Sequence, residues 1–138
     1  MGAFTLASAL LLAFSQQASA VNVRTTTPVM GWNSWNNYGC NINENLIKDS
    51  ARALISTGLR SVGYRWVTPD CGWDSPGRDS AGRQIWDSNR FPSGGQALGA
   101  YLHELGMNFG IYSGAGYFQC GSTDLPASLG EFNIKKRT

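Results

Sequence analysis

The sequence contains few of the residues that metal sites and nucleic-acid interfaces require. Charged residues make up only 14% of the 138 positions, and the single histidine, His103, lies in a segment of helical periodicity. Because there is also no CxxC pair, we expect no metal site and interpret His103 as a surface or packing residue. The formal net charge is +2, and three of the positive charges stand together at residues 135–137. No basic face is left for DNA or RNA, so nucleic acid is not an expected partner.

Several catalytic motifs are absent as well. Gly114-Ala115-Gly116 lacks the later glycine and the helix start of a dinucleotide-binding loop, so no cofactor is expected. The sequence has no serine nucleophile elbow. Nine carboxylates are present, and a glycosidase needs two that face each other. The nearest pair in one loop, Asp70 and Asp74, is better interpreted as hydroxyl-binding or turn residues, so no catalytic residue is assigned.

The first 20 residues contain no charged side chain. An apolar run at residues 6–14 is too short to span a bilayer, and Ala18-Ser19-Ala20 has the small-residue pattern that signal peptidase cleaves. We therefore predict a signal peptide at residues 1–20 and a secreted, extracellular protein. No membrane association is expected after cleavage.

The rest of the sequence has a globular composition and alternates between strand and helix patterns. Hydrophobic residues make up 42%, and 17 glycines imply many turns. We predict strands at residues 28–35, 64–68 and 108–113. Asn43 is expected to cap a helix at 44–57, and a second helix is expected at 93–105. Residues 69–91 show no periodicity and are predicted to be a long loop with turns at 74–77 and 79–82. Each helix has one apolar stripe, formed by Leu46, Ile47, Ala51, Leu54 and Ile55 in the first and by Ala97, Leu98, Tyr101, Leu102 and Leu105 in the second.

This alternation predicts an α/β fold with βαβ crossovers and a parallel sheet. The pattern by itself leaves a doubly wound sheet and a barrel open. A barrel is favoured because Trp35, Asp70 and Tyr112 each lie at or just beyond the C-terminal end of a predicted strand, where barrel active sites form. A complete barrel needs about 250 residues, so we expect about three βα units of an incomplete (β/α)8 TIM barrel.

The second predicted strand ends at Pro69 and is followed directly by a carboxylate, a thiol and an indole. Asp70 and Trp73 together are typical of a sugar site, because sugars present hydroxyls at the rim and C–H bonds on the faces. The alternative interpretation is a capping aspartate and a core tryptophan.

Ordered motifs along residues 21–130 resemble the secreted α-galactosidases of glycoside hydrolase family 27, and fungal members in particular. The motifs are Thr27-Pro28-Val29-Met30-Gly31-Trp32-Asn33-Ser34-Trp35, Gly63-Tyr64 through Asp70-Cys71-Gly72-Trp73, Arg78-Asp79-Ser80-Ala81-Gly82-Arg83, Phe91-Pro92-Ser93-Gly94, Gly110-Ile111-Tyr112-Ser113 and Pro126-Ala127-Ser128-Leu129-Gly130.

The resemblance implies a (β/α)8 barrel followed by an antiparallel β-domain, and hydrolysis of terminal α-galactose with retention through two aspartates. The substrate would be an α-galactoside oligosaccharide or polysaccharide. By the same resemblance Trp35 forms an apolar wall, Asp70 accepts hydrogen bonds from sugar hydroxyls, Tyr112 lines the pocket and Cys120 holds a loop at its edge. Many relatives carry two adjacent aspartates where this chain has Pro69-Asp70. One sugar hydroxyl therefore needs a hydrogen-bond acceptor from another residue nearby.

The resemblance also implies a disulfide between Cys40 and Cys71. Three cysteines are an odd count, and the expected partner of Cys120 lies further along the family's sequence. Residues 21–130 are thus expected to be a partial barrel, and residues 131–138 an atypical basic tail. Both catalytic aspartates are expected beyond Thr138, so the chain is interpreted as an N-terminal fragment that is inactive alone. The alternatives are a non-catalytic galactose-binding module and an α-N-acetylgalactosaminidase of the same family.

Overall fold

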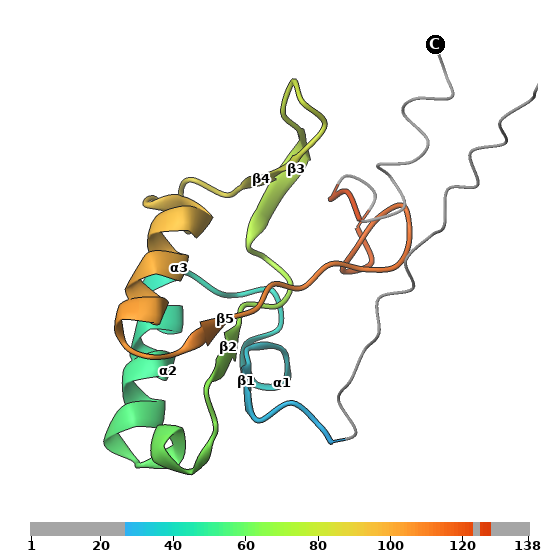
Figure 1. Ribbon diagram of the computed structural model, residues 1–138. Coiled ribbons are helices and arrows are strands. Elements are labelled where there is room, and N and C mark those ends of the chain that lie inside the picture. Colours follow the sequence, from blue (N-terminus) through green and yellow to red (C-terminus); the bar gives the residue numbers. More distant parts are fainter. Residues whose placement is uncertain (1–26, 123–124, 128–138) are drawn as a thin grey trace, which may run out of the picture.

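A computed structural model of the chain describes residues 27–122 and 125–127 (Figure 1). The predicted signal peptide at 1–20 and the basic tail at 131–138 lie outside the described residues. In chain order the elements are β1 (Gly31–Asn33), α1 (Trp35–Tyr38), α2 (Glu44–Ser56), the 3₁₀-helix η1 (Leu59–Val62), β2 (Trp66–Thr68), β3 (Asp74–Arg78), β4 (Gln84–Trp86), α3 (Gly94–Glu104) and β5 (Asn108–Phe109).

Three parallel strands form the main sheet, in the order β1-β2-β5. In this register Trp32 lies opposite Val67, and Val67 lies opposite Phe109. Figure 1 shows α2 and α3 side by side along one face of the sheet, and both helices contact strands. The predicted parallel βαβ arrangement is confirmed. The described residues form about three βα units and no closed barrel.

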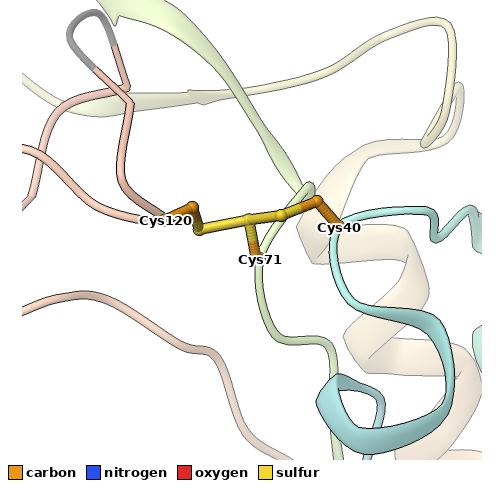
Figure 2. Close-up of side chains that lie close together, drawn as sticks. All are labelled: Cys40, Cys71 and Cys120. Atoms are coloured by element: carbon orange, nitrogen blue, oxygen red, sulfur yellow. A yellow bond between two sulfur atoms is a disulfide. The ribbon is translucent and has the colours of Figure 1, made fainter.

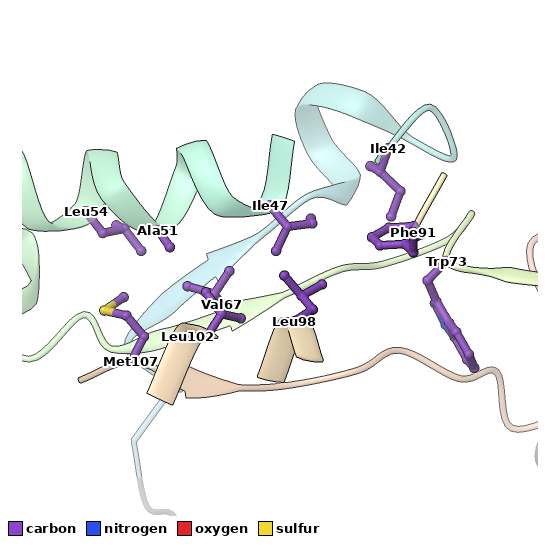
Figure 3. Close-up of a cluster of buried hydrophobic side chains, with 10 residues drawn as sticks. All are labelled: Ile42, Ile47, Ala51, Leu54, Val67, Trp73, Phe91, Leu98, Leu102 and Met107. Carbon is purple, nitrogen blue, oxygen red and sulfur yellow. The ribbon is translucent and has the colours of Figure 1, made fainter. Parts of the chain in front are cut away.

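The hydrophobic core lies between this sheet and the two helices (Figure 3). Val67, in the middle strand, is fully buried, and its neighbours Trp66 and Thr68 face the other side of the sheet. The helical residues of this core all belong to the predicted apolar stripes, although one stripe residue, Ala97, is exposed. The core residues are Ile42, Ile47, Ala51, Leu54, Val67, Trp73, Phe91, Leu98, Leu102 and Met107.

Helix α2 begins and ends as its sequence predicts. The Asn43 side chain accepts a hydrogen bond from the Leu46 N–H at 2.9 Å, and Gly58 adopts a φ of 80° just after the helix. Glu44 is buried and accepts hydrogen bonds from Lys48 and from the Ser93 N–H, so the first turn of α2 is joined to the start of α3.

The prediction of a long irregular loop at residues 69–91 was wrong. The structure has an antiparallel hairpin, β3–β4, and the predicted turn at 74–77 lies inside β3. The tight turn at 79–82 is confirmed, because Asp79 accepts from Arg83 Nε at 2.8 Å and its N–H donates to the Arg83 carbonyl at 2.9 Å. An irregularity in the strand register accommodates Pro76 and Gly77, which have low strand propensity.

The three main strands are shorter than predicted. They cover Gly31–Asn33, Trp66–Thr68 and Asn108–Phe109 rather than residues 28–35, 64–68 and 108–113. Trp35 does not end the first strand but begins a one-turn helix, α1, within the expected turn cluster. In the described part of the chain, no helix has the length and apolarity needed to cross a membrane.

Candidate functional site

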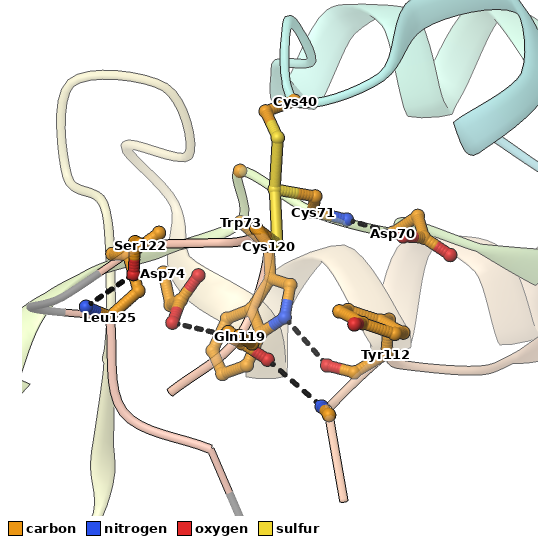
Figure 4. The surroundings of a disulfide bond; sticks show 12 residues. Cys40, Asp70, Cys71, Trp73, Asp74, Tyr112, Gln119, Cys120, Ser122 and Leu125 are labelled. Atoms are coloured by element: carbon orange, nitrogen blue, oxygen red, sulfur yellow. Dashed lines mark hydrogen bonds between the residues drawn. A yellow bond between two sulfur atoms is a disulfide. The ribbon is translucent and has the colours of Figure 1, made fainter. Parts of the chain in front are cut away.

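Asp70 lies two residues after β2 and is held in place from both sides. Its N–H donates to Ser34 Oγ at 2.9 Å, so the end of β1 fixes its backbone. Its carboxylate accepts from the Asn33 side-chain amide and from the Cys71 N–H, at 2.9 and 2.8 Å on separate oxygens (Figure 4 shows the Cys71 bond). Asp70 is only 9% exposed. Each oxygen keeps a further lone pair for an incoming donor, so the group is a pre-oriented acceptor.

Trp35 is the first residue of α1 and is half exposed at the C-terminal end of β1. Its N–H donates to the Asn33 side-chain oxygen at 2.8 Å. The Asn33 side chain therefore connects the backbone of Trp35 to the Asp70 carboxylate. Sequence reasoning included Asn33 only within a motif. The sequence feature that could have pointed to Asn33 is its position at the end of a predicted strand, two residues before the candidate Trp35.

Tyr112 follows β5 and is half-buried. Its carbonyl accepts from the Trp73 indole N–H at 2.8 Å (Figure 4). Its N–H donates to the Pro69 carbonyl at 3.3 Å. Trp73 is 3% exposed and packs against Trp86 with ring centroids 4.8 Å apart. The interpretation of Trp73 as an exposed sugar platform is therefore wrong, and the core interpretation is correct.

The glycine-rich segment 114–121 returns to this region and brings Cys120 with it. Gln119 is buried, and its side chain donates to Asp74 and accepts from the Gly114 N–H at 3.3 Å (Figure 4). The Gln119 N–H donates to the Leu125 carbonyl at 3.0 Å. These bonds place Cys120 beside Cys71.

Cys71 lies within disulfide distance of two cysteines (Figure 2). Its Cα is 4.5 Å from that of Cys40, the partner that the resemblance implies, and 5.9 Å from that of Cys120. Among the described residues, these three sulfurs form the one group of potential ligands close enough to share a metal ion, lying within 4.8 Å of one another. Sulfurs joined in a disulfide are not thiolate ligands, so we assign no metal to them.

An open hollow of about 340 Å³ lies on the sheet face opposite the helices. Asn33 and Thr68, at the C-terminal ends of β1 and β2, belong to its lining together with Trp66 and Ile111. Asn33 also bonds Asp70, so the hollow and the acceptor are adjacent. Trp35, Asp70, Tyr112 and Cys120 are not among the residues that line this hollow, and Asn33 is its contact with the Asp70 carboxylate. A fixed carboxylate close to apolar surface suits a polyhydroxylated ligand.

Comparison with known proteins identifies the family. The family model described as alpha galactosidase A matches residues 27–138. The chain belongs to this family. It is 47% identical over 117 residues to a probable alpha-galactosidase D of Aspergillus fumigatus, covering 85% of this chain and 18% of that protein. It is also 47% identical to an alpha-galactosidase of Cyamopsis tetragonoloba, over 75% of this chain and 25% of that protein.

Solved structures of the family show the same fold. Alpha-galactosidase I of Mortierella vinacea superimposes with a TM-score of 0.73 at 44% identity, over 83% of this chain and 28% of that one. The Saccharomyces cerevisiae enzyme, solved with raffinose, gives 0.70 at 36% identity, over 81% and 25%. The chain thus spans about a quarter or less of the curated relatives named above. Its fold is the N-terminal part of the family's (β/α)8 barrel.

Proposed function

We propose that this chain is the N-terminal, sugar-recognising part of a secreted α-galactosidase, which hydrolyses terminal α-D-galactose with retention of configuration. The family membership and relatives named alpha-galactosidase support the reaction. The observation that carries the recognition role is the Asp70 carboxylate, fixed by Asn33 and the Cys71 N–H at the end of β2. Secretion is supported by cysteines within disulfide distance, since disulfides persist in oxidising compartments.

In this proposal each predicted site residue has one task. Asp70 accepts hydrogen bonds from sugar hydroxyls, and the exposed Trp35 indole covers an apolar face of the ring. We assign Tyr112 to the sugar-facing side of the site at the C-terminal end of β5, and Cys120 to the edge of the site, where it holds the 114–121 segment. The nucleophile and the acid/base aspartate belong to later parts of the barrel. The 138-residue protein is therefore expected to bind galactosides without hydrolysing them.

We take galactose as the sugar because the sequence relatives named above are alpha-galactosidases, and N-acetylgalactosamine stays the alternative within the family. Competition of the two free sugars for the same site in the binding experiment below distinguishes them.

The test uses the purified 138-residue protein with methyl α-galactoside as ligand and p-nitrophenyl α-galactoside as reporter. Saturation-transfer NMR is expected to detect binding of methyl α-galactoside. Free galactose should displace this ligand and glucose should not, and Asp70→Asn should abolish the signal. No p-nitrophenol release is expected. Release of p-nitrophenol would contradict the assignment of the catalytic pair to other parts of the barrel. Absence of binding by protein that circular dichroism shows to be folded would contradict the recognition role.

A further inference from the structure

Asp74 is a buried carboxylate to which the proposed function gives no task. It begins β3, four residues after Asp70, and is 4% exposed. Its carboxylate accepts a hydrogen bond from the side-chain amide of Gln119, which is itself buried (Figure 4). Burial of a carboxylate costs free energy unless hydrogen bonds compensate it. This contact therefore holds Gln119 firmly against the start of β3.

Gln119 in turn holds the backbone that follows Tyr112. Its side-chain oxygen accepts from the Gly114 N–H at 3.3 Å. A Cβ on Gly114 would lie 3.3 Å from the Gln119 Cβ and 3.5 Å from the Tyr112 phenol oxygen. The phenol of Tyr112 therefore lies beside the stretch of backbone that Gln119 fixes.

Trp73, the residue before Asp74, holds the same stretch at its other end. Its indole N–H donates to the Tyr112 carbonyl at 2.8 Å (Figure 4). Residues 112–114 are thus fixed twice by one dipeptide, directly through Trp73 and through Gln119 in the case of Asp74. Asp70 stands three residues before Trp73 in the same segment. The chain that carries the acceptor carboxylate therefore also braces the neighbouring strand end.

We propose that Asp74 and Gln119 are positioning residues of the sugar site. They set the place of the Tyr112 phenol relative to the Asp70 carboxylate, and galactoside affinity depends on that placement. The two groups follow β5 and β2, which are neighbouring strands, and side chains beyond strand ends need contacts of their own to stay in place. The inference rests on the proposed function, which assigns both groups to the sugar. Each contact joins two described residues, so the inference does not depend on later parts of the barrel.

The test replaces Gln119 by glutamate in the 138-residue protein. Gln119→Glu removes the donor to Asp74 and puts a second carboxylate against it. We expect residues 112–121 to exchange their amide hydrogens faster, as measured by mass spectrometry. The dissociation constant for methyl α-galactoside, measured by NMR titration, should rise about tenfold. Gln96→Glu makes the same substitution at an exposed position of α3 and should change neither quantity.

The reversed pair distinguishes positioning from a general loss of packing. Asp74→Asn combined with Gln119→Glu keeps both side-chain shapes, and the asparagine amide now donates to the glutamate. The other glutamate oxygen still accepts from the Gly114 N–H. We expect the reversed pair to bind methyl α-galactoside within about twofold of the wild-type protein, because the two substitutions compensate each other. Asn43→Ala, which removes the cap of α2, should lower stability without changing affinity.

Unchanged hydrogen exchange in Gln119→Glu would overturn the inference, and so would faster exchange with unchanged affinity. A folded reversed pair that does not recover affinity would also overturn it. If Gln119→Glu does not fold, Gln119→Leu, which lacks both polar atoms and adds no charge, takes its place with the same expected loss. A wild-type protein that binds no galactoside would contradict the proposed function instead. Hydrogen exchange would then still decide whether the pair fixes residues 112–121.

Discussion

Asn33 is the residue on which the candidate site's geometry depends most. Its amide donates to Asp70 and accepts from the Trp35 N–H, at 2.9 and 2.8 Å. Replacing it by aspartate would put a second negative charge against the Asp70 carboxylate and remove the donor. A lost hydrogen bond to a charged group costs about 1.5–3 kcal/mol, or roughly 10- to 150-fold in galactoside affinity.

NMR titration with methyl α-galactoside measures that loss in Asn33→Asp. Asn36→Asp, which adds the same charge at an exposed position of α1, serves as the matched control. Equal affinities in the two variants would mean that Asn33 does not position the acceptor.

Gly72 is the second residue whose identity the structure fixes. Its φ is 94°, and a Cβ would lie 2.2 Å from the Cys40 carbonyl oxygen. Gly77 has a similar φ of 81° but open space around it. We expect Gly77→Ala to cost about 1 kcal/mol of unfolding free energy through backbone strain alone, and Gly72→Ala to cost at least about 1–3 kcal/mol more through overpacking. Urea unfolding followed by tryptophan fluorescence measures both, and similar costs would rule out the crowding.

At the scale of elements, helix α2 depends on its N-cap. The Asn43 side chain accepts the Leu46 N–H, which otherwise has no partner within the helix. Asn43→Ala should lower the unfolding free energy by about 1 kcal/mol. Asn45→Ala, at an exposed position in the first turn, is the control and should have little effect. Thermal melts of the two variants measure the difference, and a smaller loss in Asn43→Ala than in Asn45→Ala would contradict the capping role.

Glu44 joins α2 to α3 and makes this contact sensitive to acid. Burial raises the pKa of its carboxyl, but hydrogen bonds from Lys48 and Ser93 outweigh burial and bring the net pKa below the ordinary 4.5. Because the folded pKa is the lower one, the contribution to stability is complete above about pH 4.5 and is lost as pH falls through the folded pKa. Glu44→Gln should therefore make the unfolding free energy depend less on pH between pH 5 and pH 3. Glu104→Gln, at an exposed carboxylate of α3, should keep the wild-type slope in urea titrations.

At the scale of the whole molecule, the sheet face opposite the helices is open to water. Val29, Trp66 and Ile111 are 64%, 41% and 49% exposed along the hollow on that face. Contiguous apolar surface with unpaired strand edges promotes association. We expect the 138-residue protein to self-associate in sedimentation velocity experiments.

Trp66→Lys combined with Ile111→Lys should shift the protein toward monomer. Ile85→Lys changes an equally exposed apolar residue on the β3–β4 hairpin and is the control. If the control dissociated the protein as well as the double variant does, the sheet face would not be the associating surface.

The sequence alone determined the elements whose residues carry a local signal. The cap at Asn43, the stop at Gly58 and the apolar stripes predicted α2 and α3, and the alternation of strand and helix predicted the parallel sheet. The motifs of residues 27–130 predicted the family that the comparisons establish. These features depend on residues that are neighbours in the chain, so their periodicity and conformational preferences can be recognised from the sequence.

Tertiary structure decided what depends on residues far apart in the chain. Pro76 and Gly77 argue against a strand, yet pairing with β4 forms one. The burial of Trp73 follows from packing against Trp86, and the double role of Asn33 follows from the approach of β1 to β2. The meeting of three cysteines separated by 31 and 49 residues is of the same kind. Such contacts arise only when the strands align side by side, because distance in space is then no longer set by distance along the sequence.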